Sequence, residues 1–296
     1  MSDTLQENFH QHVRDLQDQI TREIRLLDPK VTLKEDVWDR VDHAGHPGGG
    51  GRTRAFQEGS IFENAGVNTS CVFGKIDPAF ASKLQGEGDT MWAAGISLIL
   101  HPYNPKVPTV HANFRMIRQG SKTWFGGGAD LTPYYPHEDD FRHFHGVWQK
   151  AAGDHYSAMK KECDEYFVNF HRGHEMRGIG GIFFDGHNTG DLQKDFAMVK
   201  SLSENFIQSY FPLVEKRFDE SYTAEDEEFQ LHRRGRYVEF NLLHDRGTLF
   251  GLKTNGRVDS ILISLPARCK FTYQYAPKAG SPHEKMMAYY RPQNWV

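Results

Sequence analysis

Three prolines spaced three residues apart, Pro102, Pro105 and Pro108, constrain this chain most strongly. Proline lacks an N–H group and has a fixed φ, so this stretch cannot continue a helix or form a central strand. The apolar run at residues 93–100 before the prolines predicts a buried strand, and the alternation at residues 109–118 after them predicts a second one. The sequence therefore predicts two strands joined by a stiff, extended connector.

The strand predicted at residues 109–118 has one polar and one apolar face. His111, Asn113 and Arg115 share a face, because successive side chains of a strand point to opposite sides. An imidazole exchanges a proton, an amide donates or accepts hydrogen bonds, and a guanidinium pairs with a carboxylate. The pattern indicates a ligand-facing surface; the alternative is a half-exposed strand with a polar outer side.

The length of 296 residues allows one large core or two domains, and no repeat or low-complexity linker marks a boundary. We therefore expect residues 1–296 to form a single domain. The net charge of −4, from 35 basic and 39 acidic residues, argues against a general nucleic-acid-binding protein. An anionic ligand would need arginines placed close to it.

The cysteines Cys71, Cys163 and Cys269 are scattered and contain no CxxC pair, which favours a reducing compartment. The longest apolar stretch, residues 92–100, is too short to span a membrane. The N-terminus carries acidic residues and resembles neither a signal peptide nor a transit peptide. We expect a cytoplasmic protein without a transmembrane segment.

Apolar periodicity predicts several helices and further strands. The helices are expected at residues 5–27, 139–152, 154–172 and 191–218, the last interrupted at Pro212. The strands are expected at residues 61–73, 178–185, 235–243, 248–253 and 257–265. The Asn255-Gly256 dipeptide is a hairpin signal between the last two strands. This order favours an α+β fold with an antiparallel sheet.

Two glycine-rich stretches allow the backbone to approach another group closely. Residues 48–51 are glycines followed by Arg52 and Arg54, and predict an anion-binding loop or a flexible surface loop. They lack the Gly-Lys-Ser/Thr ending of a nucleotide phosphate loop, and their closure over a ligand is a hypothesis. Residues 126–128 precede Asp130, which could accept N–H bonds from a ligand or satisfy the amides of a turn.

No Ser-His-Asp order, HExxH motif or GxGxxG fingerprint points to a serine hydrolase, a zinc protease or a dinucleotide-binding enzyme. His145 lies on an apolar helix face and His171 at the edge of one, where a hydrogen-bonded core histidine is the alternative to a metal ligand. The remaining aromatic residues, glycines and arginines suit a flat, apolar, polyanionic ligand.

Four ordered motifs closely resemble those of the oxygen-dependent coproporphyrinogen III oxidases. They are HPYNPKVPTVHANFR at 101–115, WFGGGADLTP at 124–133, RGIGGIFFD at 177–185 and RGRYVEFNL at 234–242. The likeness extends from about Arg40 to Trp295. It implies a large, flat antiparallel sheet with α-helices packed on both faces, and a homodimer whose contact segment is about 237–272.

The resemblance implies oxidative decarboxylation of two propionates of coproporphyrinogen III to vinyl groups. Dioxygen is the co-substrate, the products are protoporphyrinogen IX, carbon dioxide and hydrogen peroxide, and no organic cofactor is implied. By position, His111 would be the proton donor, and Asp130 would hold or deprotonate pyrrole N–H groups. The substrate-binding positions correspond to Ser97, Asn113, Phe114, Arg115, Asn255, Gly256 and Arg257.

Positions of divalent-metal ligands in bacterial relatives correspond to His101, His145 and His171. The resemblance leaves the metal open, because the family is also described as working without one. The chain departs from the family at Gly186, where members often have a second acid, and it shows no mitochondrial presequence. Two other functions remain open: a metal-dependent oxygenase or hydrolase that uses these histidines, and a non-catalytic porphyrin carrier.

Overall fold

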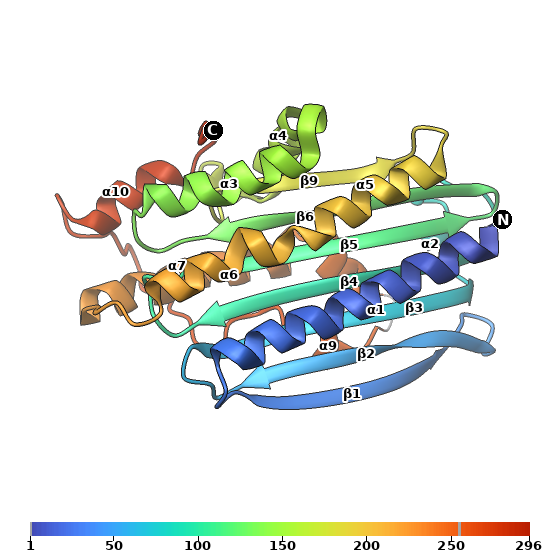
Figure 1. The fold of residues 1–296 in the computed structure, drawn as a ribbon, viewed down its shortest axis with the longest axis horizontal. Coiled ribbons are helices and arrows are strands. Elements are labelled where there is room, and N and C mark those ends of the chain that lie inside the picture. Colours follow the sequence, from blue (N-terminus) through green and yellow to red (C-terminus); the bar gives the residue numbers. More distant parts are fainter. Residues whose placement is uncertain (1, 254–255) are drawn as a thin grey trace.

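The computed structural model describes residues 2–253 and 256–296, and its centre is a seven-stranded antiparallel sheet (Figure 1). Its strands, in spatial order, are β1 (Thr32–Val41), β2 (Pro47–Gln57), β3 (Phe62–Lys75), β4 (Thr90–Pro102), β5 (Thr109–Gln119), β6 (Lys122–Thr132) and β9 (Gly181–His187). A separate two-stranded ribbon pairs β7 (Val168–Asn169) with β8 (Glu175–Met176). The predicted α+β fold with a large antiparallel sheet is confirmed.

Helices cover both faces of the sheet, as the resemblance implied (Figure 1). One face carries α1 (Ser2–Leu27), α3 (Glu138–Ala152), α5 (Leu192–Glu204) and α6 (Phe206–Arg217). The other carries α7 (Ala224–Leu243), α8 (Arg246–Lys253) and α9 (Val258–Leu262). The remaining helices are α2 (Pro78–Ala81), α4 (Tyr156–Tyr166), α10 (Pro282–Tyr289) and the 3-10 turns η1 (Gly153–His155) and η2 (Phe170–Arg172).

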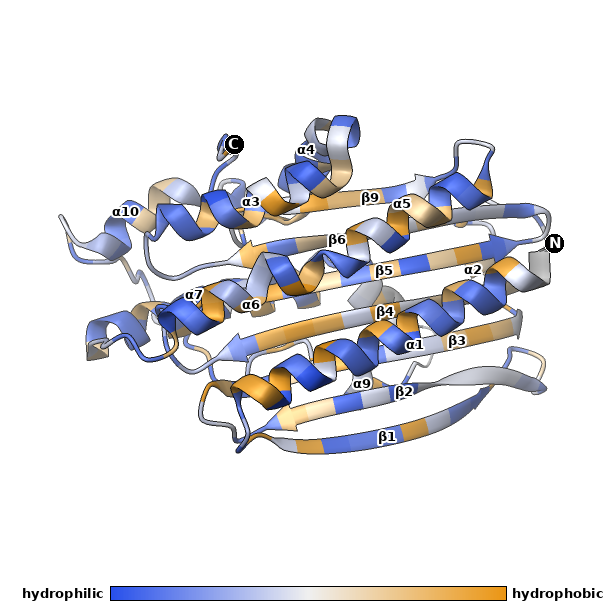
Figure 2. Cartoon of the chain, viewed as in Figure 1, coloured by the Kyte–Doolittle hydropathy of each residue, from blue (hydrophilic) through white to orange (hydrophobic). Residues whose placement is uncertain are grey.

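The helix predicted at 5–27 is α1, and its apolar stripe packs against β3 and β4. Phe9, Val13 and Ile20 in this stripe are completely buried. Hydrophilic residues occupy much of the rest of α1 (Figure 2). The buried Gln17 donates from Nε2 to the Val67 carbonyl at 2.6 Å, which satisfies its polar group inside the core. Burial of one stripe thus fixes α1 on this face.

Alternate residues of β3 bind the segment on the opposite face. Asn64 and Asn68 donate from Nδ2 to the carbonyls of Leu265 and Ser260, at 3.0 and 2.8 Å. Gly66 lies between them, and a Cβ there would come within 2.8 Å of Ile263. Because strand side chains alternate, the same strand packs against α1 with one set of residues and against α9 with the other.

The strand predicted at residues 235–243 is wrong, because these residues form the second half of α7. The apolar alternation there is also compatible with a helix, since the buried Tyr237, Phe240 and Asn241 are three and four residues apart. A capping box between Thr223 and Asp226 starts the helix upstream of the segment that was read as a strand.

The strands predicted at 248–253 and 257–265 are also wrong: α8 and α9 occupy these positions. Asn255, in the predicted hairpin turn, lies outside the described residues. The physical reason is polar contact with one face of the sheet: the α9 segment packs over β2 and β3, with the Ser260 hydroxyl 2.7 Å from that of Thr53 and the Ser260 carbonyl accepting from Asn68 at 2.8 Å.

Two predicted helices differ in extent. The helix predicted at 154–172 ends at Tyr166, because the chain then enters β7 and η2. The helix predicted at 191–218 is two helices separated at Asn205, whose N–H closes the end of α5 by bonding to the carbonyls of Leu202 and Ser203. Pro212 lies inside α6 and does not mark the break.

The glycines at 48–51 are part of strand β2, which pairs with β1 and β3, and they are not a loop. Their missing side chains are needed for packing, since a Cβ at Gly51 would lie 2.3 Å from the Trp38 ring. Arg52 and Arg54 pair with Asp18 of α1. The hypothesis that this segment closes over a ligand is therefore wrong, because both of its edges are held in the ladder.

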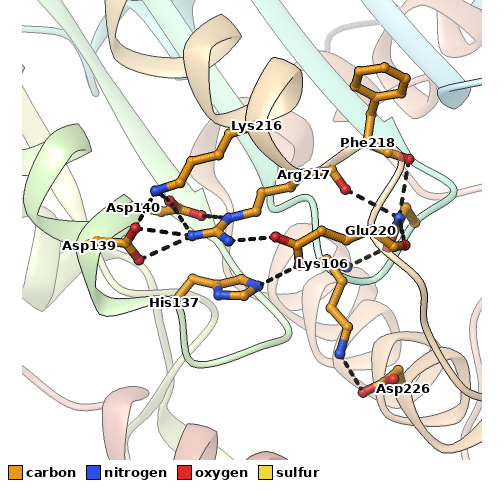
Figure 3. Close-up of polar contacts among 10 residues, drawn as sticks. Lys106, His137, Asp139, Asp140, Lys216, Arg217, Phe218, Glu220 and Asp226 are labelled. Carbon is orange, nitrogen blue, oxygen red and sulfur yellow. Dashed lines mark hydrogen bonds and ion pairs between the residues drawn. The ribbon is translucent and has the colours of Figure 1, made fainter.

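The proline-containing connector is present between β4 and β5, and side chains anchor it (Figure 3). Asn104 donates from Nδ2 to the carbonyls of Arg217, Phe218 and Glu220 at 2.8–3.3 Å. Lys106 lies over the Tyr135 ring, 3.2 Å from its centre, and pairs with Asp226 at 3.1 Å. These contacts hold the end of β4 and the start of β5 in place.

An ion-pair cluster centred on Arg217 lies beside the connector (Figure 3). Arg217 donates from Nε and Nη2 to the two oxygens of Asp140, at 2.9 and 3.0 Å. It also pairs with Asp139 at 3.1 Å and with Glu220 at 2.5 Å. Because Asp140 is only 2% exposed, this pair joins the start of α3 to the end of α6 inside the protein.

We expect Asp140→Ala to lower the free energy of unfolding by about 2–3 kcal/mol, since it removes the bidentate partner of a buried arginine while Asp139 and Glu220 compensate in part. Urea denaturation measures this change. The control is Glu165→Ala, which removes an exposed pair with Lys161 at 3.9 Å and should change stability little. Equal effects of the two substitutions would contradict the prediction.

Candidate active site

The face of the sheet opposite α1 brings five of the predicted site residues, Ser97, His111, Asn113, Arg115 and Asp130, into three neighbouring cross-strand rows. The rows are Ser70-Gly95-Arg115-Gly126, Asn68-Ser97-Asn113-Gly128 and Gly66-Ile99-His111-Asp130, from β3 to β6. We call these residues the site face. His111, Asn113 and Arg115 lie on one face of β5, as the alternation predicted.

Glycines keep the centre of the site face low. Ser97 is exposed although β4 is the central strand of the sheet. Gly95 on the same strand and Gly128 in the same row have no side chains that could cover Ser97. At Gly126 an added Cβ would lie 2.8–2.9 Å from the Arg115 guanidinium, so this glycine lets Arg115 lie against the strand. The accessible part of the site face is therefore around Ser97, Asn113 and Arg115, whereas Ile99 and Asp130 in the third row are buried.

His111 and Asp130 form a hydrogen-bonded pair across β5 and β6. The distance from His111 Nδ1 to Asp130 Oδ1 is 2.9 Å. The side chain of Asp130 is 1% exposed and that of His111 is 15% exposed, so the imidazole is the member of the pair that reaches solvent. Among residues 2–253 and 256–296, no partner bonds to Nε2 of His111.

Arg177 binds the other side of the Asp130 carboxylate. Its Nε donates to Oδ2 at 2.8 Å and its Nη2 to Oδ1 at 2.7 Å, which is the bidentate geometry of a strong ion pair. Nη1 donates to Asn241 Oδ1 of α7 at 2.7 Å. The guanidinium carbon lies 4.1–5.0 Å from the ring centres of Phe167, Tyr237 and Phe240, so aromatic faces surround the cation.

These contacts fix the charge state of Asp130. Burial alone would raise the pKa of this carboxyl, but the charge of Arg177 and the hydrogen bonds from His111 and Arg177 hold it below its usual value. An ionised carboxylate only accepts hydrogen bonds, so His111 must carry its proton on Nδ1 to donate to it. When the imidazole is neutral, Nε2 then carries the lone pair.

Sequence reasoning assigned no role to Arg177 or Asn241. Both stand inside motifs that carried the family resemblance, RGIGGIFFD and RGRYVEFNL, and that position was the available signal. The contact of Asn241 with Arg177 could not be inferred, because it depends on α7 being a helix that packs over the sheet and not a strand within it.

The two predicted carboxylate-binding arginines are each paired with an acid. Arg115 donates from Nη1 to Asn113 Oδ1 and from Nη2 to Asp185 Oδ1, both at 2.8 Å. Arg257, which precedes α9, pairs with Asp36 of β1. Gly256 bonds through its N–H to the Gly251 carbonyl at 2.8 Å. Arg115 is on the site face, and Arg257 comes to the same side of the sheet from the α9 segment.

Phe114 is the predicted substrate-binding residue whose side chain points elsewhere. It alternates with Asn113 and Arg115, lies on the α1 side and is 1% exposed within the hydrophobic core. Its side chain supports β5 from behind and does not belong to the site face.

The three predicted metal-ligand histidines do not come together. His101 is buried near α9, with Nδ1 3.2 Å from the Thr109 hydroxyl and Nε2 3.1 Å from the Ser264 carbonyl. His145 on α3 lies on the other side of the sheet, 2.8 Å from the Tyr156 hydroxyl and 3.1 Å from the Ile179 carbonyl. His171 in η2 is exposed, and its ring nitrogens lie beside His244 and Glu239.

This donor arrangement does not fit one divalent cation. Both ring nitrogens of His101 and of His145 already have protein partners, as core histidines do. Across the described part of the chain, no group of three or more His, Cys, Asp or Glu residues is placed to hold a metal ion.

No helix among the described residues is long and apolar enough to cross a membrane.

Burial lowers the pKa of both His101 and His145 to about 3. The unfolded chain takes up these protons near pH 6.5 and the folded protein does not, so stability must decrease as the pH falls below 6.5. Each histidine contributes a slope of about 1.4 kcal/mol per pH unit between the two pKa values.

We expect His145→Gln to reduce the pH dependence of the unfolding free energy by about one proton, measured by urea denaturation between pH 7 and 5. The exposed His43→Gln is the control and should retain the wild-type slope; an unchanged slope in His145→Gln would contradict the assignment.

A comparison with protein families matches this chain to one family. The family model described as coproporphyrinogen III oxidase matches residues 8–295, which include every strand of the sheet and each residue of the site face. This match covers nearly the whole chain, and the family links it to oxidative chemistry on a porphyrin precursor. The chain belongs to the coproporphyrinogen III oxidase family.

Proposed function

We propose that this protein uses dioxygen to decarboxylate two propionates of coproporphyrinogen III, giving protoporphyrinogen IX. The observation that carries the proposal is the His111-Asp130-Arg177 chain, which ends at a partly exposed imidazole on the strand that also carries Arg115. A tetrapyrrole with four carboxylates complements in charge the arginines on this side of the sheet.

Atoms balance for each propionate when the oxidant is dioxygen. The group –CH2–CH2–COO⁻, one O2 and one proton give –CH=CH2, CO2 and H2O2. The bond to the carboxyl carbon breaks, its electron pair forms the vinyl double bond, and a hydride equivalent from the ring-side carbon reduces dioxygen. The protein must therefore hold the propionate, move a proton and exclude competing reactions.

His111 is the group we assign to proton movement. Its Nε2 has no bonding partner among the described residues, and the hydrogen bond from Nδ1 to Asp130 stabilises the ring when it is protonated. Both Asp130 oxygens are engaged by Arg177, and one by His111, so we assign Asp130 to orienting His111 and not to direct contact with pyrrole N–H groups. Arg177 is a positioning residue for this carboxylate.

Ser97, Asn113 and Arg115 are the residues we assign to substrate contact on the site face. Arg115 provides a planar fork for one propionate, and Ser97 and Asn113 provide neutral hydrogen-bonding groups beneath the macrocycle. Arg257 is assigned to a further propionate from the α9 side. The role of Asn255 remains a prediction from the resemblance.

No step in this mechanism passes through a metal, because the three histidines suggested as ligands do not form a site together.

We further propose a cytoplasmic homodimer whose contact includes residues from 237–272. Size-exclusion chromatography with light scattering tests the dimer, and the expected mass is twice that of the 34.0 kDa chain.

The direct test is product formation from coproporphyrinogen III, followed by protoporphyrin fluorescence after oxidation. Samples are incubated in air or under strict anaerobiosis, each with and without EDTA. We expect product only in air and no effect of EDTA. Loss of activity with EDTA would support a metal-dependent enzyme, and binding without turnover in air would support a porphyrin carrier.

We expect His111→Ala to lower kcat by about 10²- to 10⁴-fold, the range associated with loss of one general acid–base group. Substrate binding should change less than kcat, because the arginines remain. The matched control is His43→Gln, an exposed histidine on the β1–β2 turn. Wild-type turnover by His111→Ala would contradict the assignment of the proton-transfer group.

A further inference from the structure

The carboxylate of Asp185 lies at the position where Arg115 would bind a carboxylate of a ligand. Arg115 Nη2 donates to Asp185 Oδ1 at 2.8 Å. The other oxygen of Asp185 lies 3.8 Å from Arg246 Nη2. A carboxylate between two guanidinium groups is the arrangement that a propionate would adopt at the same position.

Arg115 does not depend on Asp185 for its orientation. Asn113 accepts a separate hydrogen bond from Nη1 at 2.8 Å, and Gly126 leaves the space in which the guanidinium lies against β6. Removing the Asp185 charge would leave both of these contacts in place. Asp185 therefore binds the Arg115 guanidinium but is not required to hold that guanidinium in its orientation.

The pair is also weak enough to be displaced. The side chains of Arg115 and Asp185 are 31% and 33% exposed, and ion pairs with this much solvent contact contribute little to stability. Asp185 ends the apolar part of β9, and its carboxylate reaches solvent on the same side of the sheet as the site face. The Asp185 side chain can therefore rotate away into the solvent when a ligand carboxylate takes its place at Arg115.

We propose that Asp185 is an internal competitor of the substrate: in the ligand-free protein its carboxylate occupies the position of one substrate propionate at Arg115. This inference rests on the proposed function. Its consequence is specificity, because an anion with one carboxylate must displace Asp185 for a single new ion pair. A tetracarboxylate gains further contacts from its other groups after the same displacement.

A second pair follows the same pattern. Arg257, the other arginine assigned to a propionate, is bound by Asp36 on β1, and side chains of both partners are partly exposed. Asp36 pairs in register with Thr53, which pairs with Asn68 of the site face, so its side chain lies on the same side of the sheet. Each arginine assigned to substrate is thus held by one acid on an edge strand.

The test measures binding of coproporphyrin III, the oxidised and unreactive form that keeps all four propionates, through its change in absorbance. We expect Asp185→Asn to lower Kd by about two- to fivefold, the range that corresponds to loss of one partly exposed ion pair. The substitution preserves size, and thermal denaturation checks that the variant is folded.

Two controls separate competition from a general effect of charge. Glu35→Gln removes an acid that pairs with Arg54 at 2.7 Å on the α1 side of the sheet, and it should leave Kd unchanged. In an Arg115→Ala background, Asp185→Asn should also have no effect, because the site of competition is gone.

Each outcome has a distinct meaning. Tighter binding by Asp185→Asn alone, absent in the Arg115→Ala background, supports the inference. Unchanged or weaker binding by Asp185→Asn, or equal tightening in both backgrounds, overturns it while leaving the proposed function intact. Failure of the wild-type protein to bind coproporphyrin III would overturn the proposed function and this inference together.

Discussion

The buried ion pair between Arg177 and Asp130 connects the fold to the chemistry of the site. Both side chains are at most 2% exposed, and each would be a costly unpaired charge without the other. The pair joins β6 to the segment before β9, and its hydrogen bonds extend to His111 on β5 and Asn241 on α7. One contact of α7 with the sheet side and the charge state of the candidate catalytic pair therefore depend on this interaction.

The two faces of the central strands serve different purposes. On the α1 side, Phe114, Val110 and Leu98 are buried in the core and stabilise the sheet. On the other side, the glycines at 95, 126 and 128 carry no side chains, and Ser97 remains exposed on the central strand. A sheet whose two faces were both filled with apolar side chains would have no surface for a broad ligand. Binding of the proposed substrate thus requires that one face of the sheet lacks bulky side chains around Ser97.

Charge on the site face is local and already neutralised in pairs. The chain has a net charge of −4, so its overall field does not attract a polyanion. Affinity must come from individual arginines, and Arg115 and Arg257 each contact one acid in the absence of ligand. This arrangement makes carboxylate binding an exchange of partners, in which a ligand with several carboxylates has the advantage.

The sequence by itself determined the elements with regular periodicity: the helix of α1, the strands β4 and β5, and the polar side of β5 with His111, Asn113 and Arg115. These follow from local rules, because alternation and the helical stripe record which face of each element is buried. Its motifs also determined the family, through residues that stand in a fixed order along the chain. It did not determine the state of residues 235–265, where alternating apolar residues fit a helix as well as a strand.

Only the tertiary structure decided which of these residues meet. Arg177 and Asn241 are 64 positions apart and bind the same site because α7 packs across the sheet. The glycines at 48–51 lie in a strand paired on both sides, where Trp38 and the neighbouring strands leave no room for side chains. His101 and His145 were separated onto opposite faces of the sheet. Contacts between distant segments depend on packing and on the pairing of buried charges, which no local pattern in the sequence records.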